Sequence, residues 1–104
     1  TAKINVKFLN GSHGDNYSFD GIGGVLGHAY YPPNGNVHFD AAEVWSQGTN
    51  LGISLKWVAV HEFGHVLGLA HSNISTSIMF PYYPGYRDNF SLSLDDINAI
   101  KMLY

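Results

Sequence analysis

The feature that most constrains this chain is the motif HEFGHVLGLAH at residues 61–71. Its first two histidines, His61 and His65, are four residues apart, so on a helix both imidazoles lie on one face and can reach a single metal ion. Glu62 is rotated by about 100° from His61 around such a helix, which places its carboxylate beside the metal rather than among the ligands. There it can accept a proton from a metal-bound water. The first half of the motif therefore predicts a metal site with its own general base.

The second half of the motif supplies a third ligand. Gly68 permits a sharp break three residues after His65, through a positive φ or a close backbone approach, so the chain can bring His71 back to the metal. Three neutral nitrogen ligands leave the fourth position of a tetrahedral zinc open for water, as in catalytic sites. An isolated HExxH often arises by chance on amphipathic helices. The added Gly68 and His71, and Met79 eight residues further on, argue against a chance match.

Composition narrows the class of protein and its partners. A chain of 104 residues has room for one domain with a modest core, and 45% hydrophobic against 12% charged residues excludes a disordered chain. The net charge of −3 provides no polybasic face, so neither nucleic acid nor an anionic membrane surface is an expected partner. No apolar run approaches the roughly 20 residues that span a bilayer. No signal peptide is visible at Thr1.

Thiols and glycosylation motifs bear on the compartment. The chain has no cysteine, so thiol usage does not identify a redox compartment. Four Asn-x-Ser motifs, which permit glycosylation in a eukaryotic secretory setting, begin at Asn10, Asn16, Asn73 and Asn89. They favour a secreted protein, although the abundance of Asn and Ser makes some of them chance matches.

Hydrophobic periodicity predicts short strands followed by helices, and the expected fold class is α+β with a small twisted sheet. Alternating or short apolar runs, bounded by turn residues, predict strands at 3–9, 25–31 and 37–39. The first strand is expected to be half-buried, and the other two to adjoin across a turn at 32–36. Loops are expected at 10–24 and 46–54, with Trp45 as a packing anchor.

Two helices are predicted after the strands. The first covers residues 55–67 and carries the metal motif. Its apolar contacts are expected to include Val58, Val66 and Leu67. Residues 68–92 are expected to be irregular because of their prolines and glycines. Ser93 and Asp96 form a capping-box-like start to a last helix at 94–104, whose expected apolar stripe is Leu94, Ile97, Ile100 and Tyr104.

The remaining histidines invite a second metal site. Four further ligands of zinc type are His13, Asp15, His28 and His38. Four protein ligands would close a tetrahedral zinc and make the site structural. The alternative is that they are ordinary polar loop residues and one strand histidine. Asp20, Asp40 and Glu43 could join backbone carbonyls around Ca²⁺, which prefers six to eight oxygen ligands.

These residues resemble the matrixins, the matrix metalloproteinases of the metzincin clan, whose signature is HExxHxxGxxH followed by a turn that bears Met. The similar segments are His13-Gly14-Asp15, Phe19-Asp20-Gly21, Leu26-Gly27-His28-Ala29-Tyr30, His38-Phe39-Asp40, Trp45, the helix at 55–67 and Ser77-Ile78-Met79-Phe80-Pro81-Tyr82-Tyr83. Ser72, after the third histidine, is the matrixin choice and disfavours other metzincin subfamilies. The resemblance implies a metzincin-like single domain at 1–104, with an upper part at 1–70 and a lower part at 71–104. It also implies a short chain that lacks the N-terminal strands and first helix of that fold.

The resemblance assigns the metal ligands to three sites. The catalytic zinc is held by His61, His65 and His71. A structural zinc is held by His13, Asp15, His28 and His38. At least one calcium ion is held by Asp20, Asp40 and Glu43, with backbone carbonyls near Gly21, Gly23 and Val25. Two zinc ions and at least one calcium ion are therefore expected.

Substrate-binding residues are implied in the same way. The strand around Leu26 and Gly27 resembles the substrate-binding edge of the family, to which a peptide would add in antiparallel orientation. Pro81 and Tyr83 resemble the wall of the pocket for the residue just after the cut, where apolar side chains are expected. Met79 would form an apolar floor beneath the zinc ligands. Plain core packing is the alternative for Met79 and for Tyr83.

The resulting expectation is a secreted, monomeric zinc endopeptidase that cleaves extended protein or peptide substrates of the extracellular-matrix type. Zinc would lower the pKa of its bound water and polarise the scissile carbonyl, while Glu62 would take the proton of that water and pass it to the departing amine. Hydroxamate-type or protein inhibitors of matrixins would be further partners. The alternative is a minimal zinc- and calcium-binding domain that binds peptides or inhibitors with little or no turnover.

Overall fold

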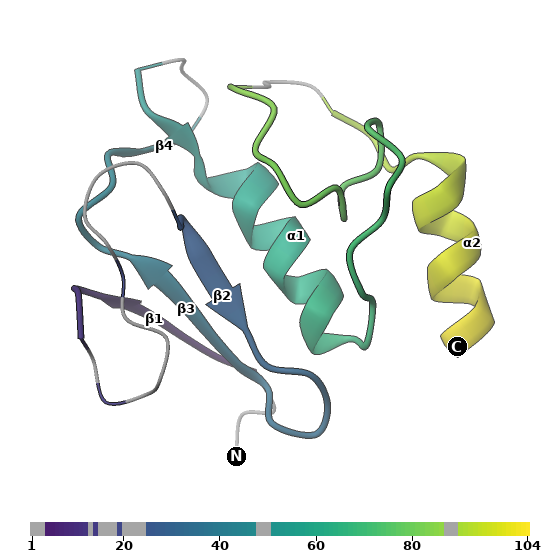
Figure 1. Ribbon diagram of the computed structural model, residues 1–104, viewed down its shortest axis with the longest axis horizontal. Helices are drawn as coiled ribbons and strands as arrows, with labels where there is room; N and C mark the ends of the chain where they lie inside the picture. The colour runs from purple at the N-terminus through teal and green to yellow at the C-terminus, as the bar shows by residue number, and fades with distance from the viewer. Residues whose placement is uncertain (1–3, 13, 15–18, 20–24, 48–50, 87–89) are drawn as a thin grey trace.

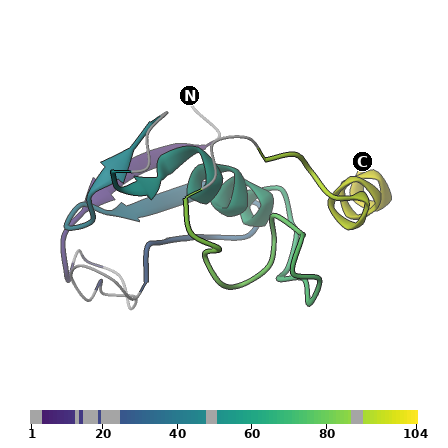
Figure 2. The same cartoon turned by 90° about the horizontal axis from the view of Figure 1, so that it is seen from above.

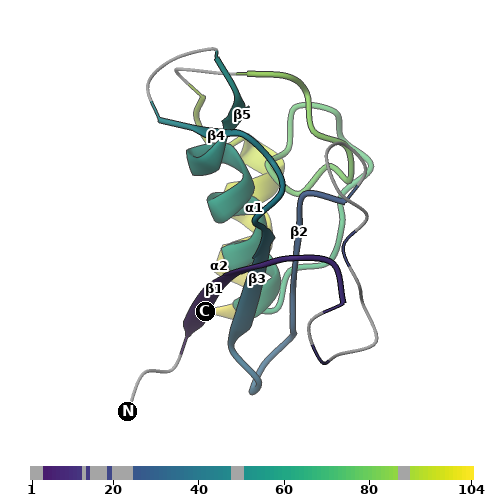
Figure 3. The ribbon, with the colours of Figure 1, turned by 90° about the vertical axis from the view of Figure 1, so that its left-hand side faces the viewer.

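The fold is a small α+β arrangement, as the sequence predicts. The computed structural model describes residues 4–12, 14, 19, 25–47, 51–86 and 90–104 (Figure 1). Its elements are β1 (Asn5–Leu9), β2 (Gly27–Ala29), β3 (Asn36–Asp40), β4 (Trp45–Ser46), β5 (Ile53–Ser54), α1 (Leu55–Val66) and α2 (Leu94–Leu103). The sheet, α1 and α2 follow one another across the molecule in Figure 1, and in Figure 3, which views it from the side of the sheet, α2 lies behind α1.

The main sheet has three strands in the order β1-β3-β2. β2 and β3 are antiparallel, with His28 opposite His38, so they form the predicted hairpin. β1 runs parallel to β3 and pairs Phe8 with Phe39. The predicted strand at 25–31 is longer than β2, because the chain turns away soon after Tyr30 donates its N–H to the Asn36 carbonyl at 3.1 Å. β2 is thus left at the edge of the sheet that lies nearer α1 (Figure 1).

Two predictions about strands are wrong. The alternation at 3–9 predicts a half-buried strand, but residues 5–8 are all exposed, because α1 packs on β2 and β3 and leaves β1 at the far edge. The predicted loop at 46–54 contains β5, which pairs in parallel with β4. The N–H of Ile53 donates to the Val44 carbonyl at 2.7 Å, and Gly52 permits this approach because a Cβ there would overlap the same oxygen.

α1 carries the metal motif and one side of the core. The Ser54 side chain caps it by accepting a hydrogen bond from the N–H of Trp57 at 3.2 Å. The helix ends one residue earlier than predicted, and Leu67 is 41% exposed, so the apolar contact expected for it is wrong. Gly68 takes a φ of +109°, which confirms the predicted break. The core buried between α1, the sheet and the following segment consists of Val37, Phe39, Trp57, Val58, Val66, Ile78 and Met79.

Trp45 is a packing anchor, as predicted. Its indole N–H donates to the carbonyl of Asp40 at 2.9 Å. Its ring lies edge-on to Phe39, with 5.6 Å between centroids, and to Phe8, with 6.1 Å. The tryptophan therefore ties the end of β3 to the outer strand β1.

The close packing of Gly64 against Met79 predicts a destabilised variant. A Cβ added at Gly64 would overlap the Sδ of the buried Met79. Alanine is otherwise favoured over glycine in a helix by about 1 kcal/mol, while overpacking a core costs about 1–3 kcal/mol. We therefore expect Gly64→Ala to lower the free energy of unfolding by about 1 kcal/mol in urea denaturation. The double variant with Met79→Ala should lose less than the sum of the single losses, and additive losses would contradict the predicted overlap.

α2 is attached through polar contacts, at one end of the molecule (Figure 2). The predicted capping box is present, with Ser93 and Asp96 bonding each other's backbone N–H. The predicted apolar stripe is wrong at its ends, since Leu94 is 72% and Tyr104 78% exposed. The buried residue of the helix is instead Asp96, which bonds the segment at 77–78. Within the part of the chain that the structure describes, neither helix has the length and apolar character that crossing a bilayer requires.

Candidate metal centre

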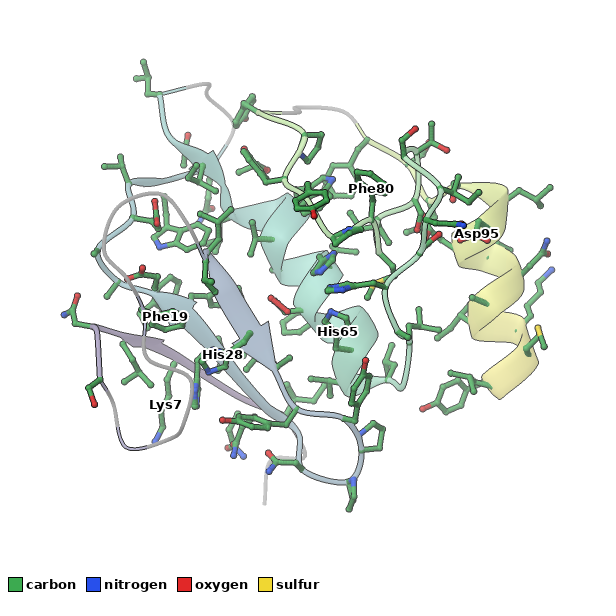
Figure 4. All side chains as sticks on the ribbon, viewed as in Figure 1. Lys7, Phe19, His28, His65, Phe80 and Asp95 are labelled. Carbon is green, nitrogen blue, oxygen red and sulfur yellow. The ribbon has the colours of Figure 1, made fainter. Side chains whose placement is uncertain are left out.

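Three histidines converge where α1 ends. His61, His65 and His71 each offer a ring nitrogen, and these atoms all lie within 4.8 Å of one another. The first two are buried on α1, and the break at Gly68 brings the exposed His71 back beside them. Ring centroids are 4.8–5.3 Å apart. Figure 4 shows His65 on α1 facing the segment that follows the helix. The structure thus brings together the three ligands that the motif predicts.

Backbone carbonyls fix the orientation of two of these rings. Nδ1 of His61 lies 2.6 Å from the carbonyl oxygen of Ile78, and Nδ1 of His65 lies 2.8 Å from that of Leu69. A carbonyl oxygen only accepts, so each Nδ1 must carry the hydrogen and donate it. The Nε2 atoms of both rings are then left with their lone pairs available to a metal.

Burial sets the protonation states of the site. It lowers the pKa of His61 to about 4, although the hydrogen bond to Ile78 acts in the opposite direction. Burial likewise lowers the pKa of His65, so both imidazoles are neutral near pH 7, which is the form that binds metal. Burial raises the pKa of Glu62 to about 7. Oε1 of Glu62 lies 4.0 Å from Nε2 of His65. A carboxylate that titrates near neutrality beside three imidazoles is suited to general acid–base chemistry.

A cleft of about 530 Å³ lies over the histidines, between α1, β2 and the segment at 81–83. It contains the predicted substrate-binding residues Leu26, Gly27, Pro81 and Tyr83 together with the metal motif. The Tyr83 hydroxyl accepts a hydrogen bond from the N–H of Ser54 at 2.8 Å, which fixes this wall to the start of α1. The metal ligands and the predicted pocket therefore face one continuous space.

The sequence reasoning missed two aromatic residues of the cleft. Trp57 stacks on the ring of His61, with 5.3 Å between centroids and 15° between planes, and lies edge-on to Tyr83 at 5.6 Å. Its position four residues before His61, on the same helix face, could have indicated this contact. Tyr31 lies edge-on to His65 at 5.7 Å. It is the last residue of the predicted strand at 25–31, next to the hairpin turn, and no feature of the sequence points from there to the helix.

Comparison with known proteins identifies the family. A family model described as Matrixin matches residues 1–104 of the chain. The chain belongs to the matrixins. Membership implies zinc as the metal of the histidine site, and the donor set fits, because three imidazole nitrogens suit Zn²⁺ whereas oxygen-rich sets suit Mg²⁺ or Ca²⁺. The matrixin family and the fold expected from the resemblance are thereby confirmed.

This chain is similar in sequence to several known proteins. A hatching enzyme of Paracentrotus lividus is 54% identical over 101 residues, which cover 97% of this chain and 17% of the relative. A matrilysin of Rattus norvegicus is 47% identical over 108 residues, which cover 100% of this chain and 40% of the relative. A macrophage metalloelastase of Rattus norvegicus is 53% identical over 110 residues, which cover 99% of this chain and 23% of the relative. The chain thus spans less than half the length of these relatives.

Two members of the predicted structural-zinc site lie together in this matrixin. Nε2 of His28 on β2 is 3.0 Å from Nδ1 of His38 on β3, because the hairpin register places the two residues opposite each other. Phe19 stacks on His28 with 4.9 Å between centroids. Figure 4 shows His28 well apart from His65 on α1. The other two predicted ligands, His13 and Asp15, lie outside the described residues.

The predicted calcium site has two buried carboxylates. Asp40 is 0% and Glu43 7% exposed. Within the described residues, Oδ2 of Asp40 and Oε2 of Glu43 have no hydrogen-bond partner. A buried carboxylate oxygen without a partner is costly, and a bound cation would remove that cost. Val25 is described and half exposed, whereas Asp20, Gly21 and Gly23 lie outside the described residues.

Proposed function

We propose that this matrixin is a zinc-dependent endopeptidase that cleaves extended protein or peptide substrates of the extracellular-matrix type. The observation that carries the proposal is the buried Glu62 beside three converging imidazoles at the floor of a cleft that runs along a sheet edge. The matching relatives include a matrilysin and a metalloelastase, whose names support protein substrates. An assay of the zinc-loaded protein for hydrolysis of fluorescence-quenched peptide substrates of matrixins tests this proposal.

The chain's residues divide the chemistry among them. A zinc ion held by the three histidines would supply Lewis acidity, which activates water and polarises a carbonyl group. Glu62 accepts the proton of the attacking water at a carboxylate oxygen and then donates it to the departing amine. Burial by itself raises the pKa of Glu62 to about 7, toward the range in which a group can gain and lose a proton near neutral pH. The carbonyls of Ile78 and Leu69 hold His61 and His65 in the orientation that binding requires.

The substrate adds to the edge of β2. In the antiparallel pair with β3, the carbonyl of Leu26 accepts from Asp40 and the N–H of Tyr30 donates to Asn36. Because bonding alternates along an antiparallel pair, the backbone groups of Gly27 and Ala29 point away from β3, toward the cleft. A peptide that runs antiparallel to β2 can bond to these groups. The proposed single domain at 1–104 then encloses the peptide between an upper part at 1–70 and a lower part at 71–104.

The pocket for the residue after the cut is proposed to lie between Pro81, Tyr83 and Trp57. Trp57 lines both the cleft and a second cavity of about 270 Å³. Met79 packs beneath the zinc-binding helix against Gly64, a place compatible with both a floor for the ligands and plain core packing. The tryptophan ring would limit the depth of the pocket.

Shortening the side chain at Trp57 should change substrate preference. In Trp57→Leu the two cavities would merge. The kcat/KM for peptides with a long apolar side chain after the cut should then rise relative to that for peptides with a short one. We expect roughly a tenfold change in the ratio of their kcat/KM values, since a single methylene is worth at least that much in a fitted pocket. The ratio is independent of the folded fraction, so destabilisation does not disturb it. An unchanged ratio would exclude Trp57 from the pocket.

Two zinc ions and at least one calcium ion per chain are proposed, and elemental analysis of the folded protein tests this. The unpartnered oxygens of Asp40 and Glu43 support the calcium site, and the paired His28 and His38 support the second zinc. His71→Ala should remove one zinc and His38→Ala the other. A single zinc at saturation in wild-type protein would eliminate the structural zinc site.

The proposal includes an extracellular location and inhibitors as further partners. The four Asn-x-Ser motifs favour a secreted, extracellular protein. Hydroxamate-type inhibitors would offer the histidine site a metal-binding group, and protein inhibitors of matrixins would dock in the cleft of a monomer. Binding of a hydroxamate to the zinc-loaded protein, but not to the zinc-free protein, is the expected result.

A second candidate is a metal-binding domain with little turnover. It is favoured by β1, where Val6 is 46% and Phe8 48% exposed, because an uncovered apolar strand could leave the sheet too loose to hold a substrate. This candidate predicts tight hydroxamate binding without peptide hydrolysis. The endopeptidase predicts both.

A further inference from the structure

Tyr31 is an aromatic residue in the cleft that the proposed chemistry does not use. Its side chain is 53% exposed and lines the cleft. The ring lies edge-on to the ring of His65, with 5.7 Å between centroids and 86° between planes. A half-exposed tyrosine that lines the cleft beside a metal ligand is placed to contact a molecule that enters.

The turn that carries Tyr31 is fixed at both of its ends. The carbonyl of Tyr31 accepts from the N–H of Asn34 at 3.1 Å, and the Asn34 side chain accepts from the N–H of Asn36, where β3 begins, at 3.0 Å. Pro32 approaches Gly68, where an added Cβ would lie 3.9 Å from its Cγ. The turn therefore rests on the C-terminal end of α1, and the ring is positioned before a substrate binds.

Tyr31 and Tyr83 lie at opposite ends of the cleft. Tyr31 contacts His65 in the last turn of α1, whereas Tyr83 contacts Trp57 and the helix cap at Ser54. Positions 57 and 65 are about 12 Å apart along a helix that rises 1.5 Å per residue. The side chains before and after a cut at the histidines would thus meet different tyrosines.

The direction of β2 assigns the two ends. β2 runs from Gly27 to Ala29 and leads to Tyr31, so a peptide antiparallel to it has its amino-terminal part beside Tyr31 and its carboxyl-terminal part beside Val25. This agrees with the wall of Pro81 and Tyr83 as the pocket for the residue after the cut. Tyr31 is then placed to contact a substrate side chain on the amino side of the scissile bond.

We propose that Tyr31 selects the substrate side chain on the amino side of the scissile bond and prefers an aromatic or other apolar residue within the last two positions before the cut. The inference rests on the proposed endopeptidase function and names a substrate class for it. Among the described residues that line the cleft, Glu62 is the one with a carboxylate, and none is lysine or arginine. An exposed aromatic ring in such surroundings favours apolar partners.

Peptide sets test this proposal. Each set varies one of the two positions before the cut among Phe, Leu, Gly and Asp and keeps the rest constant. Wild type should prefer Phe or Leu at one position, and Tyr31→Ala should reduce that preference in kcat/KM by about 3- to 10-fold, the range of an aromatic contact. Tyr31→Phe should retain it. Tyr82→Ala, which removes an exposed tyrosine that lines the cleft next to Tyr83, should change preference only after the cut.

Measuring the zinc content distinguishes two roles of Tyr31, selection of the substrate and support of the His65 ring. If Tyr31 only holds the ring of His65, Tyr31→Ala should lower zinc affinity and slow all peptides by the same factor, and that result would overturn the proposal. Binding of the same peptides to zinc-loaded Glu62→Gln, with and without Tyr31→Ala, provides a readout that needs no turnover. Absence of hydrolysis by wild type would refute the endopeptidase alone. Equal affinities for Phe and Gly peptides in both Glu62→Gln proteins would refute the role of Tyr31.

Discussion

Replacing Glu62 with glutamine should abolish peptide hydrolysis while zinc remains bound. Glutamine has the shape of glutamate but cannot take up the proton of the attacking water, and a general acid–base group contributes about 10²- to 10⁴-fold in rate. We therefore expect kcat to fall by at least 10²-fold. Zinc should stay because the three imidazoles converge on one point without Glu62.

The matched control for this variant is His71→Ala, which removes a ligand instead of the base. It should lose its activity and the zinc ion held by His61, His65 and His71. Glu62→Gln should retain that zinc ion and bind a hydroxamate. Turnover of Glu62→Gln near the wild-type rate would contradict the role of the carboxylate. Loss of zinc from Glu62→Gln would show instead that Glu62 supports the metal.

Removing the carboxylate of Asp96 should be the most destabilising change in α2. The carboxylate accepts hydrogen bonds from the N–H groups of Ile78 at 3.0 Å and Ser93 at 2.8 Å, and from the Ser77 hydroxyl. Asp96→Ala would leave buried donors at Ile78 and Ser77 unpaired, each at a cost of about 1–3 kcal/mol. We expect the free energy of unfolding in urea to fall by about 2–5 kcal/mol.

The exposed Asp95 is the matched control. Among the residues that the structure describes, it accepts one hydrogen bond, from the Ser72 hydroxyl at 2.7 Å, so Asp95→Ala should cost much less than Asp96→Ala. Asp96 also acts on the metal site, because the carbonyl of Ile78 accepts from Nδ1 of His61. Zinc affinity should therefore fall in Asp96→Ala and not in Asp95→Ala. Equal losses of stability in the two variants would contradict this account.

The same contacts make stability depend on pH. Burial by itself would raise the pKa of Asp96, but the hydrogen bonds from Ile78, Ser77 and Ser93 outweigh it and lower the pKa. A lowered pKa in the folded state gives a stabilisation that is complete above the pKa of the unfolded chain and is lost as pH falls through the folded-state pKa. The stability difference between wild type and Asp96→Asn should thus be constant near neutral pH and shrink in acid. A difference that persists through acid unfolding would contradict the shift.

The metal motif was predictable because its geometry is local. His61 and His65 share a helix face by their spacing alone, and Gly68 takes the positive φ that the break requires. The capping box of Ser93 and Asp96 is equally local. For such features the conformation follows from neighbours within one or two helical turns.

The misassigned elements depend on contacts that a sequence does not display. β5 forms because Gly52 lets the chain approach the carbonyl of Val44. The apolar alternation of β1 does not say that α1 will cover only the other two strands. Tyr31 reaches His65 only because the hairpin turn rests against Gly68. These placements are decided by how the hairpin and α1 pack.

The parallel pairing of β1 with β3 also determines the order in which the sheet can assemble. The β2–β3 hairpin closes across the short turn at 30–35, whereas β1 must find β3 across residues 10–35. Closing a longer loop costs more entropy, so this pairing comes late. Among the strands that the structure describes, the one synthesised first is therefore the last to gain its partner. Until then Val6 and Phe8 are open to association with other nascent chains.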